Sequence, residues 1–210
     1  LRLTVVIFPT LEKAESQCIL ACSELALLIN EHGCIAIEIG DQCISTKAQV
    51  KTKRWSKVDA CIYPNGKIEI KLTPLDQYSG PVVIVNEQLK SLPNWPIIGS
   101  ITIAARLSDN TATEHFNGKV EAPIFEIDNK PFASWDFTQQ MSTVDIPAIF
   151  GPAITLHNFP ARAMTSSQWD GSEMCWRHKP EQYAAIHFHQ DDIYDFNWQT
   201  NFSFEIPMAM

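Results

Sequence analysis

The side chains best suited to joint chemistry in this sequence are Asp59, Glu69 and Lys71, two carboxylates and one ammonium. They lie within residues 58–72, where apolar and polar residues alternate on either side of a Pro-Asn-Gly segment. Alternation with a period of two predicts a β-hairpin with one apolar and one polar face. All three charged side chains then share the polar face, provided that the turn sets the required register.

The turn of this hairpin therefore decides whether the three side chains meet. The Pro-Asn-Gly segment suits a three-residue loop, in which a type I turn precedes a glycine in the left-handed conformation. This loop places Asp59 opposite Lys71 and Cys61 opposite Glu69. A two-residue Asn-Gly turn would shift the register and point Asp59 away from Glu69. We predict the three-residue loop.

Asp59 followed by Glu69-Ile70-Lys71 resembles the core of the PD-(D/E)xK nucleases, over residues 11–72 only. The resemblance implies that Asp59 and Glu69 hold Mg²⁺, while Lys71 helps to orient or activate the attacking water. Mg²⁺ prefers carboxylate oxygens and stabilises the charge that develops on phosphate. A metal-dependent nuclease with a nucleic-acid substrate is therefore one function that we consider.

The resemblance also implies a possible third acid, because a carboxylate on the first helix of that family sometimes completes the site. Glu24 is the nearest match. The stretch 73–81 departs from the family, since its nine residues, with Pro74, Gly80 and Pro81, are too short and broken for the next helix. The alternative is a half-exposed hairpin whose polar face carries an ordinary Asp–Lys cross-strand pair.

A second candidate metal site is His187-Phe188-His189, because both imidazoles of such a strand point to one face. Cys175, His178 or Asp191 could supply a third ligand for Zn²⁺. The spacing fits no standard ligand pattern, and two surface histidines on an acidic strand are the alternative.

The order of elements predicts an α+β fold. The segments expected are a strand at 3–8, an amphipathic helix at 11–32, a strand at 34–39, a basic loop at 41–57, the hairpin and a strand at 81–86. Short strands separated by turn residues follow, at 100–107, 119–127, 153–158, 183–189 and 202–206. We predict an α/β part at 1–92 and a mostly antiparallel, sandwich-like part at 97–210, or one continuous domain.

Composition narrows the function classes. Residues 44–73 hold seven basic and two acidic residues, whereas residues 121–210 hold four basic and twelve acidic ones. The net charge of −8 argues against nonspecific nucleic-acid binding by the whole surface. No apolar run approaches the roughly 18 residues of a membrane span, and the opening residues 1–9 resemble a strand, not a signal peptide.

Six cysteines without a C-x-x-C pair favour reduced thiols and a cytoplasmic setting. Because no complete catalytic motif is present, the preferred function is a non-catalytic module that binds another protein or its own copies, without a cofactor. Accessible aromatic side chains in the C-terminal half would support it. The nuclease with Mg²⁺ is the alternative, so the sequence leaves open whether the chain is an enzyme.

Overall fold

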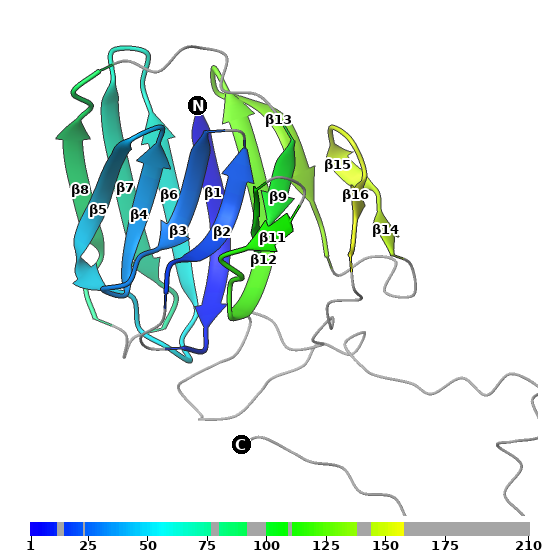
Figure 1. Cartoon of the computed structure of the whole chain (residues 1–210), viewed down its shortest axis with the longest axis horizontal. Coiled ribbons are helices and arrows are strands. Elements are labelled where there is room, and N and C mark those ends of the chain that lie inside the picture. The colour runs from blue at the N-terminus through cyan, green and yellow to red at the C-terminus, as the bar shows by residue number, and fades with distance from the viewer. Residues whose placement is uncertain are drawn as a thin grey trace, which may run out of the picture.

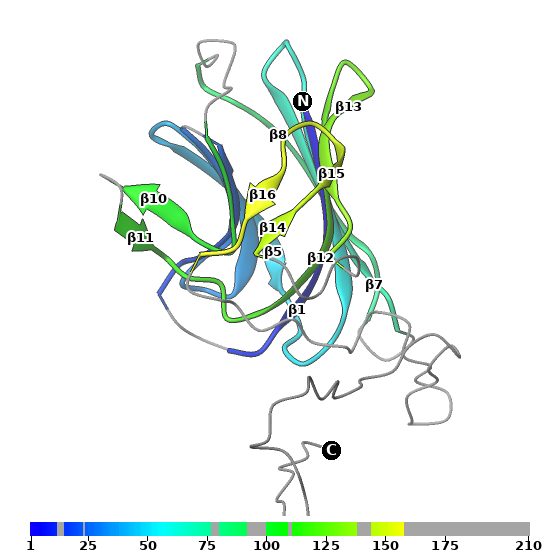
Figure 2. The ribbon, with the colours of Figure 1, turned by 90° about the vertical axis from the view of Figure 1, so that its right-hand side faces the viewer.

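The chain forms two antiparallel β-sheets that pack face to face in a computed structural model (Figures 1 and 2). The structure describes residues 1–11, 15–22, 24–76, 80–91, 100–108, 111–137 and 144–157. These residues contain strands and no helix. The predicted α+β class is therefore wrong, and the described part of the chain is a β-sandwich. None of its segments forms a helix long and apolar enough to cross a membrane.

One sheet has seven strands and the other has five. The larger sheet has the order β15 (Ala148–Phe150), β13 (Lys130–Trp135), β12 (Gly118–Ile127), β1 (Arg2–Pro9), β6 (Ser56–Ile62), β7 (Lys67–Pro74) and β8 (Val83–Gln88). The smaller sheet has the order β5 (Gln42–Gln49), β4 (Cys34–Ile39), β3 (Leu25–Ile29), β2 (Gln17–Cys22) and β9 (Ile101–Ile103). Two small ribbons pair β10 (Arg106–Ser108) with β11 (Thr111–Thr113) and β14 (Asp145–Ile146) with β16 (Ile154–Thr155).

The main core lies between the two sheets. Alternate residues of each strand enter it, as Leu3, Val5 and Ile7 do from β1. Each fully buried aliphatic side chain of this kind stabilises the fold by about 1.5–3 kcal/mol relative to an exposed one. The alternation leaves the intervening side chains on the outer face of each sheet.

The helix predicted at 11–32 is replaced by the β2–β3 hairpin. Leu25, Leu27 and Ile29 face the main core, whereas Ala26 and Leu28 join a second buried cluster on the other side of the sheet. A strand buried on both faces has an almost unbroken apolar run, which periodicity cannot separate from a buried helix. The basic loop predicted at 41–57 is also wrong in part, because β5 occupies residues 42–49.

The register predicted for the 58–72 hairpin is confirmed. Asp59 pairs with Lys71 and Cys61 pairs with Glu69 across β6 and β7. Gly66 has φ 82°, and its N–H donates to the carbonyl oxygen of Tyr63 at 2.9 Å. The Pro-Asn-Gly segment thus forms the three-residue loop with a left-handed glycine.

Strand β1 lies at the middle of the larger sheet, between β6 and β12. Its pairing with β12 crosses the boundary predicted at residues 92–97, so strands from both predicted parts share one sheet. Residues 100–157 form antiparallel strands where they are described, as expected. The strands predicted at 183–189 and 202–206 lie outside the described residues. Whether 1–92 and 97–210 fold as separate units stays untested.

Candidate functional site

Asp59, Glu69 and Lys71 lie together on the outer face of the seven-stranded sheet. The residues that alternate with them, such as Ala60 and Ile70, are fully buried in the main core. Asp59 is directly opposite Lys71, and Glu69 lies two residues before Lys71 on β7, so the two carboxylates are diagonal neighbours. The structure therefore brings together the three residues that the sequence singled out.

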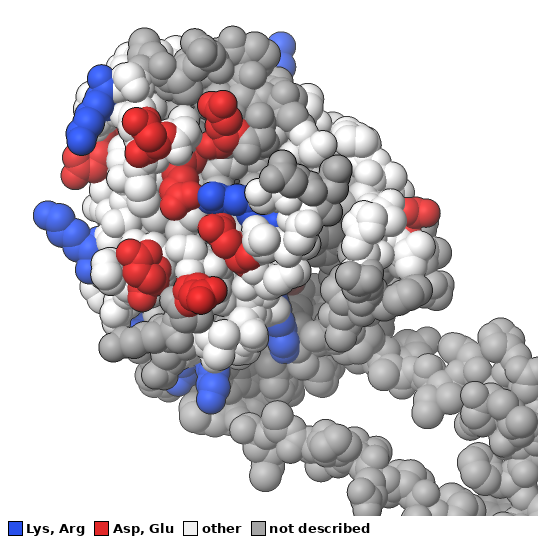
Figure 3. All heavy atoms as spheres, viewed as in Figure 1, with Lys and Arg blue, Asp and Glu red and all other residues white. Residues whose placement is uncertain are grey.

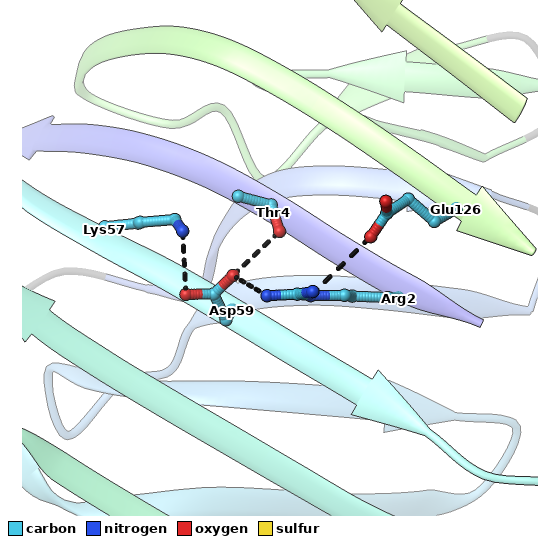
Figure 4. A network of polar contacts seen from close by, with 5 residues as sticks. All are labelled: Arg2, Thr4, Lys57, Asp59 and Glu126. Atoms are coloured by element: carbon cyan, nitrogen blue, oxygen red, sulfur yellow. Dashed lines mark hydrogen bonds and ion pairs between the residues drawn. The ribbon is translucent and has the colours of Figure 1, made fainter. Parts of the chain in front are cut away.

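The Asp59 carboxylate is held by neighbours on its own sheet (Figure 4). Its Oδ1 accepts hydrogen bonds of 2.9 Å from Thr4 Oγ1 and from Arg2 Nη2. Its Oδ2 lies 3.3 Å from Lys57 Nζ. Arg2 Nε also lies 3.7 Å from Glu126 Oε2, so the network spans β12, β1 and β6. These contacts tie three neighbouring strands together on the outer face.

The electrostatics of Asp59 favour its charged form. Burial by itself raises the pKa of Asp59, but the hydrogen bonds from Thr4, Arg2 and Lys57 outweigh it and leave that pKa below its ordinary value. The hydrogen bond to Asp59 in turn raises the pKa of Arg2. Asp59 is thus an ionised carboxylate whose charge is balanced by two cations within the sheet.

The remaining predicted ligands are more dispersed. Glu69 Oε2 lies 3.9 Å from Lys67 Nζ, and both side chains are partly exposed. Glu24 lies at the turn between β2 and β3, in the other sheet, where its carbonyl oxygen accepts a hydrogen bond from Gly40 N–H. In the part of the chain that the structure describes, no group of three His, Cys, Asp or Glu side chains is placed to hold a metal ion.

The catalytic roles of Asp59, Glu69 and Lys71, and Mg²⁺ binding by the two acids, stay predictions. A Mg²⁺-dependent cleavage assay that compares the wild type with Glu69→Ala would test them. The second predicted site, His187 and His189 with Cys175, His178 or Asp191, lies outside the described residues. Of the six cysteines, the five in the described residues form no disulfide.

A second charged cluster, absent from the sequence predictions, lies on the outer face of the five-stranded sheet. Arg106 donates a short hydrogen bond to Glu38 Oε2, and its Nε lies 3.1 Å from Glu114 Oε2. Figure 3 shows acidic side chains gathered over this sheet, with most of the visible basic ones at its rim. The sequence held a signal for this face, because residues 14–46 contain five acidic residues and no Lys or Arg.

The Arg106 cluster covers a buried thiol. Burial raises the pKa of Cys18 to about 12, although Arg106 beside it acts in the opposite direction. Ala104 and Glu114, which flank the β10–β11 ribbon, have φ values of 63° and 50°. Non-glycine residues rarely adopt this conformation. Here hydrogen bonds to β2 hold both of them, from Ala104 N–H to Ile19 O and from Cys18 N–H to Glu114 O. The ribbon is therefore fixed at its base.

Exposed apolar side chains gather at the β13–β15 end of the larger sheet. Ile149 is 60% exposed, Phe150 51% and Phe132 38%. Phe150 pairs with Ser134, which lies two residues along β13 from Phe132. Accessible aromatic side chains therefore occur in the C-terminal half, as the sequence analysis anticipated. We call these three residues the β15 patch.

The described residues define an antiparallel β-sandwich with charged outer faces. The chain superposes with a TM-score of 0.52 on a protein of Bacteroides ovatus that is provisionally assigned as carbohydrate-binding. The superposition covers 72% of this chain and 50% of that protein, at 13% sequence identity. Identity this low supports a shared fold and no more.

In sequence, the chain is similar to two curated proteins. It is 31% identical over 121 residues to the β subunit of N,N-dimethylformamidase from Alcaligenes, and 31% identical over 108 residues to that from Paracoccus aminophilus. These matches cover 46% and 48% of this chain, but only 16% and 14% of the relatives. No family model matches the sequence. The chain thus resembles a small part of a much larger enzyme subunit.

Proposed function

We propose that this chain is a non-catalytic β-sandwich module that takes part in assembling an amidase-type enzyme of more than one subunit. The observation that carries the proposal is its similarity to the β subunits of two N,N-dimethylformamidases, proteins named as subunits of a larger enzyme. Because the match spans a small part of each relative, a structural or docking role suits this segment better than the whole catalytic activity.

The geometry of the described residues supports a non-catalytic role. The most buried carboxylate, Asp59, is paired with Arg2, Lys57 and Thr4, so its oxygens are committed to contacts within the sheet. Arg106 is likewise committed to Glu38 and Glu114. Side chains engaged in this way stabilise the surface of the fold and leave little capacity for acid, base or metal chemistry.

The β15 patch is the surface that we assign to the partner within such an assembly. Aromatic and aliphatic side chains dominate the buried centre of protein interfaces, whereas charged ones are depleted there. Ile149, Phe150 and Phe132 supply such a centre at the end of the seven-stranded sheet. The expected partner is an apolar surface on another part of the amidase-type assembly.

An affinity tag on the chain at its natural locus, followed by native mass spectrometry of the purified complex, tests the proposal. We expect a complex of defined mass that contains an amidase polypeptide and hydrolyses N,N-dimethylformamide, while the purified chain alone does not. Recovery of the chain only by itself or with its own copies would contradict the assembly role. Hydrolysis by the chain alone would contradict the non-catalytic role.

A pair of matched variants tests the assigned surface. Phe150 on β15 and Leu107 on β10 are equally exposed, at 51% and 50%. If Phe150 is a central interface residue, Phe150→Ser weakens the complex at least about tenfold, which corresponds to about 1.4 kcal/mol. Leu107→Ser is expected to leave the complex intact. Equal effects of the two substitutions would exclude the β15 patch as the contact.

A further inference from the structure

The edges of the two sheets differ in how well they are protected. An edge strand exposes unpaired backbone N–H and C=O groups, and proteins normally block it with shortness, bulges, lysine or proline. Among the described strands, β15 and β9 at two of the four edges have only three residues each. At the third edge, β5 carries Lys47 and pairs with β4 through a register shift. Three of the four edges are therefore blocked.

Strand β8, at the fourth edge, has none of these features and carries one charged residue, Glu87, near its C-terminal end. It has six residues, contains neither Lys nor Pro, and pairs with β7 without a register shift. It is the last strand of its sheet in the described part of the chain, and Figure 1 shows it at the outer side of the sandwich. A regular strand of this length is a template for pairing with another strand.

The side chains of β8 are apolar on both faces at its N-terminal half. Ile84 is 56% exposed on the outer face, where it pairs with Lys71 of β7. Val83 and Val85 point the other way and pack, half-buried, against the edge of the main core. Val82, just before the strand, is 47% exposed. The open edge of the sheet is thus continuous with exposed apolar surface.

We propose that β8 pairs with β8 of a second copy of this chain, antiparallel and across a two-fold axis at Ile84. This inference adds a contact between two copies of the chain within the proposed assembly and therefore rests on the proposed function. A two-fold axis perpendicular to the sheet keeps the outer faces together, so Ile84 meets Ile84 of the second copy. Val83 meets Val85 of that copy on the inner face. The seven-stranded sheets then become one continuous sheet.

The charges around this axis are compatible with self-pairing. In the proposed register, Glu87, the one charged residue of β8, lies opposite Pro81 of the second copy. Lys71 lies on β7, the strand next to β8. In the dimer, the two β7 strands that carry Lys71 are therefore three strand spacings, about 14 Å, apart. This distance exceeds the Debye length of about 8 Å at physiological salt. No like charges therefore face each other directly.

Sedimentation equilibrium of the full 210-residue chain over a range of concentrations tests the proposal. We expect the wild type to approach twice its chain mass as its concentration rises. Ile84→Lys and Ile84→Glu are each expected to remain monomeric, because two like charges would meet at the axis. An equimolar mixture of the two variants should dimerise again, since an ammonium then faces a carboxylate. Leu107→Lys, at an equally exposed apolar position on β10, should still dimerise.

A wild type that stays monomeric at every concentration, or an Ile84→Lys variant that still dimerises, would overturn the proposal. Ile84→Lys places a lysine opposite Lys71 within its own sheet, whereas Ile84→Glu does not, so the glutamate variant keeps the test valid if the lysine variant misfolds. Hydrogen exchange gives a second readout, because the β8 amides of the wild type should become more protected as concentration rises. A monomeric chain that still joins the amidase complex would refute this dimer and leave the proposed function standing.

Discussion

The contacts of Asp59 predict a measurable loss of stability in Asp59→Asn. The amide keeps an oxygen that can accept the Thr4 hydrogen bond but removes the charge that Arg2 and Lys57 balance. Hydrogen bonds to a charged group contribute about 1.5–3 kcal/mol when buried. Arg2 and Lys57 are 45% and 38% exposed, which reduces each contribution to about 0–1 kcal/mol. We therefore expect the free energy of unfolding to fall by about 1–2 kcal/mol.

Urea unfolding at neutral pH measures this difference, and thermal unfolding should show a Tm lower by about 2–8 °C for a domain of this size. Glu69→Gln is the control, because its one described ion pair, with Lys67 at 3.9 Å, is partly exposed. A pair of this kind is expected to change stability by less than about 0.5 kcal/mol. Equal losses for the two variants would contradict our account of the outer face.

The pH dependence of the free energy of unfolding tests whether the charge of Asp59 causes the loss of stability. Because the pKa of Asp59 is lowered in the folded protein, its ionised form contributes fully above the unfolded pKa of about 3.9. That contribution disappears as the pH falls through the lower, folded pKa. The difference in free energy of unfolding between wild type and Asp59→Asn should therefore be constant from about pH 5 to 8 and should decrease toward zero at acidic pH. A difference that persists unchanged below both pKa values would refute the electrostatic explanation.

Three further outcomes follow from the described contacts. In the native protein, Cys43, which is exposed, should react with a thiol reagent much faster than Cys18, which is fully buried with a pKa of about 12; equal rates would contradict the burial of Cys18. Arg106→Gln should speed hydrogen exchange in the β10–β11 ribbon and lower the free energy of unfolding by about 1 kcal/mol, because two ion pairs are lost at partly exposed positions. Unchanged exchange would show that backbone hydrogen bonds alone hold the ribbon. Gly118→Ala should destabilise the fold by about 1–3 kcal/mol in chemical unfolding, because its Cβ would come within 2.4 Å of the Phe8 carbonyl oxygen; a neutral result would show that β1 and β12 can move apart.

The sequence predicted local geometry well where turn chemistry was explicit. The Pro-Asn-Gly segment defined the 58–72 hairpin, its register and therefore the neighbourhood of Asp59, Glu69 and Lys71. It could not reveal that Arg2 and Thr4 would lie beside Asp59, because β1 joins β6 across more than fifty residues. A local sequence pattern does not predict which distant strands will pair.

The helix prediction failed for a related reason. Strands β2 and β3 are almost entirely apolar because both of their faces are buried, one in the main core and the other in the second cluster. The alternation that marks a half-exposed strand is then absent. The apolar residues at helical spacing, three and four positions apart, were present only because nearly every residue of these two strands is apolar. The absence of Lys and Arg between residues 14 and 46 could have indicated the acidic outer face, but no prediction made use of it.

The central position of β1 has a consequence for synthesis of the chain. Leu3 leaves the ribosome before both of its neighbours: Ala60 on β6 follows more than fifty residues later, and Phe125 on β12 more than a hundred. At translation rates of about 5–20 residues per second, β1 waits about 6–24 s for its second neighbour. Non-local pairing of this kind also makes intrinsic folding slow, on the scale of milliseconds to seconds. A nascent chain that stalls before residue 118 would thus expose an apolar central strand, the species on which chaperones act.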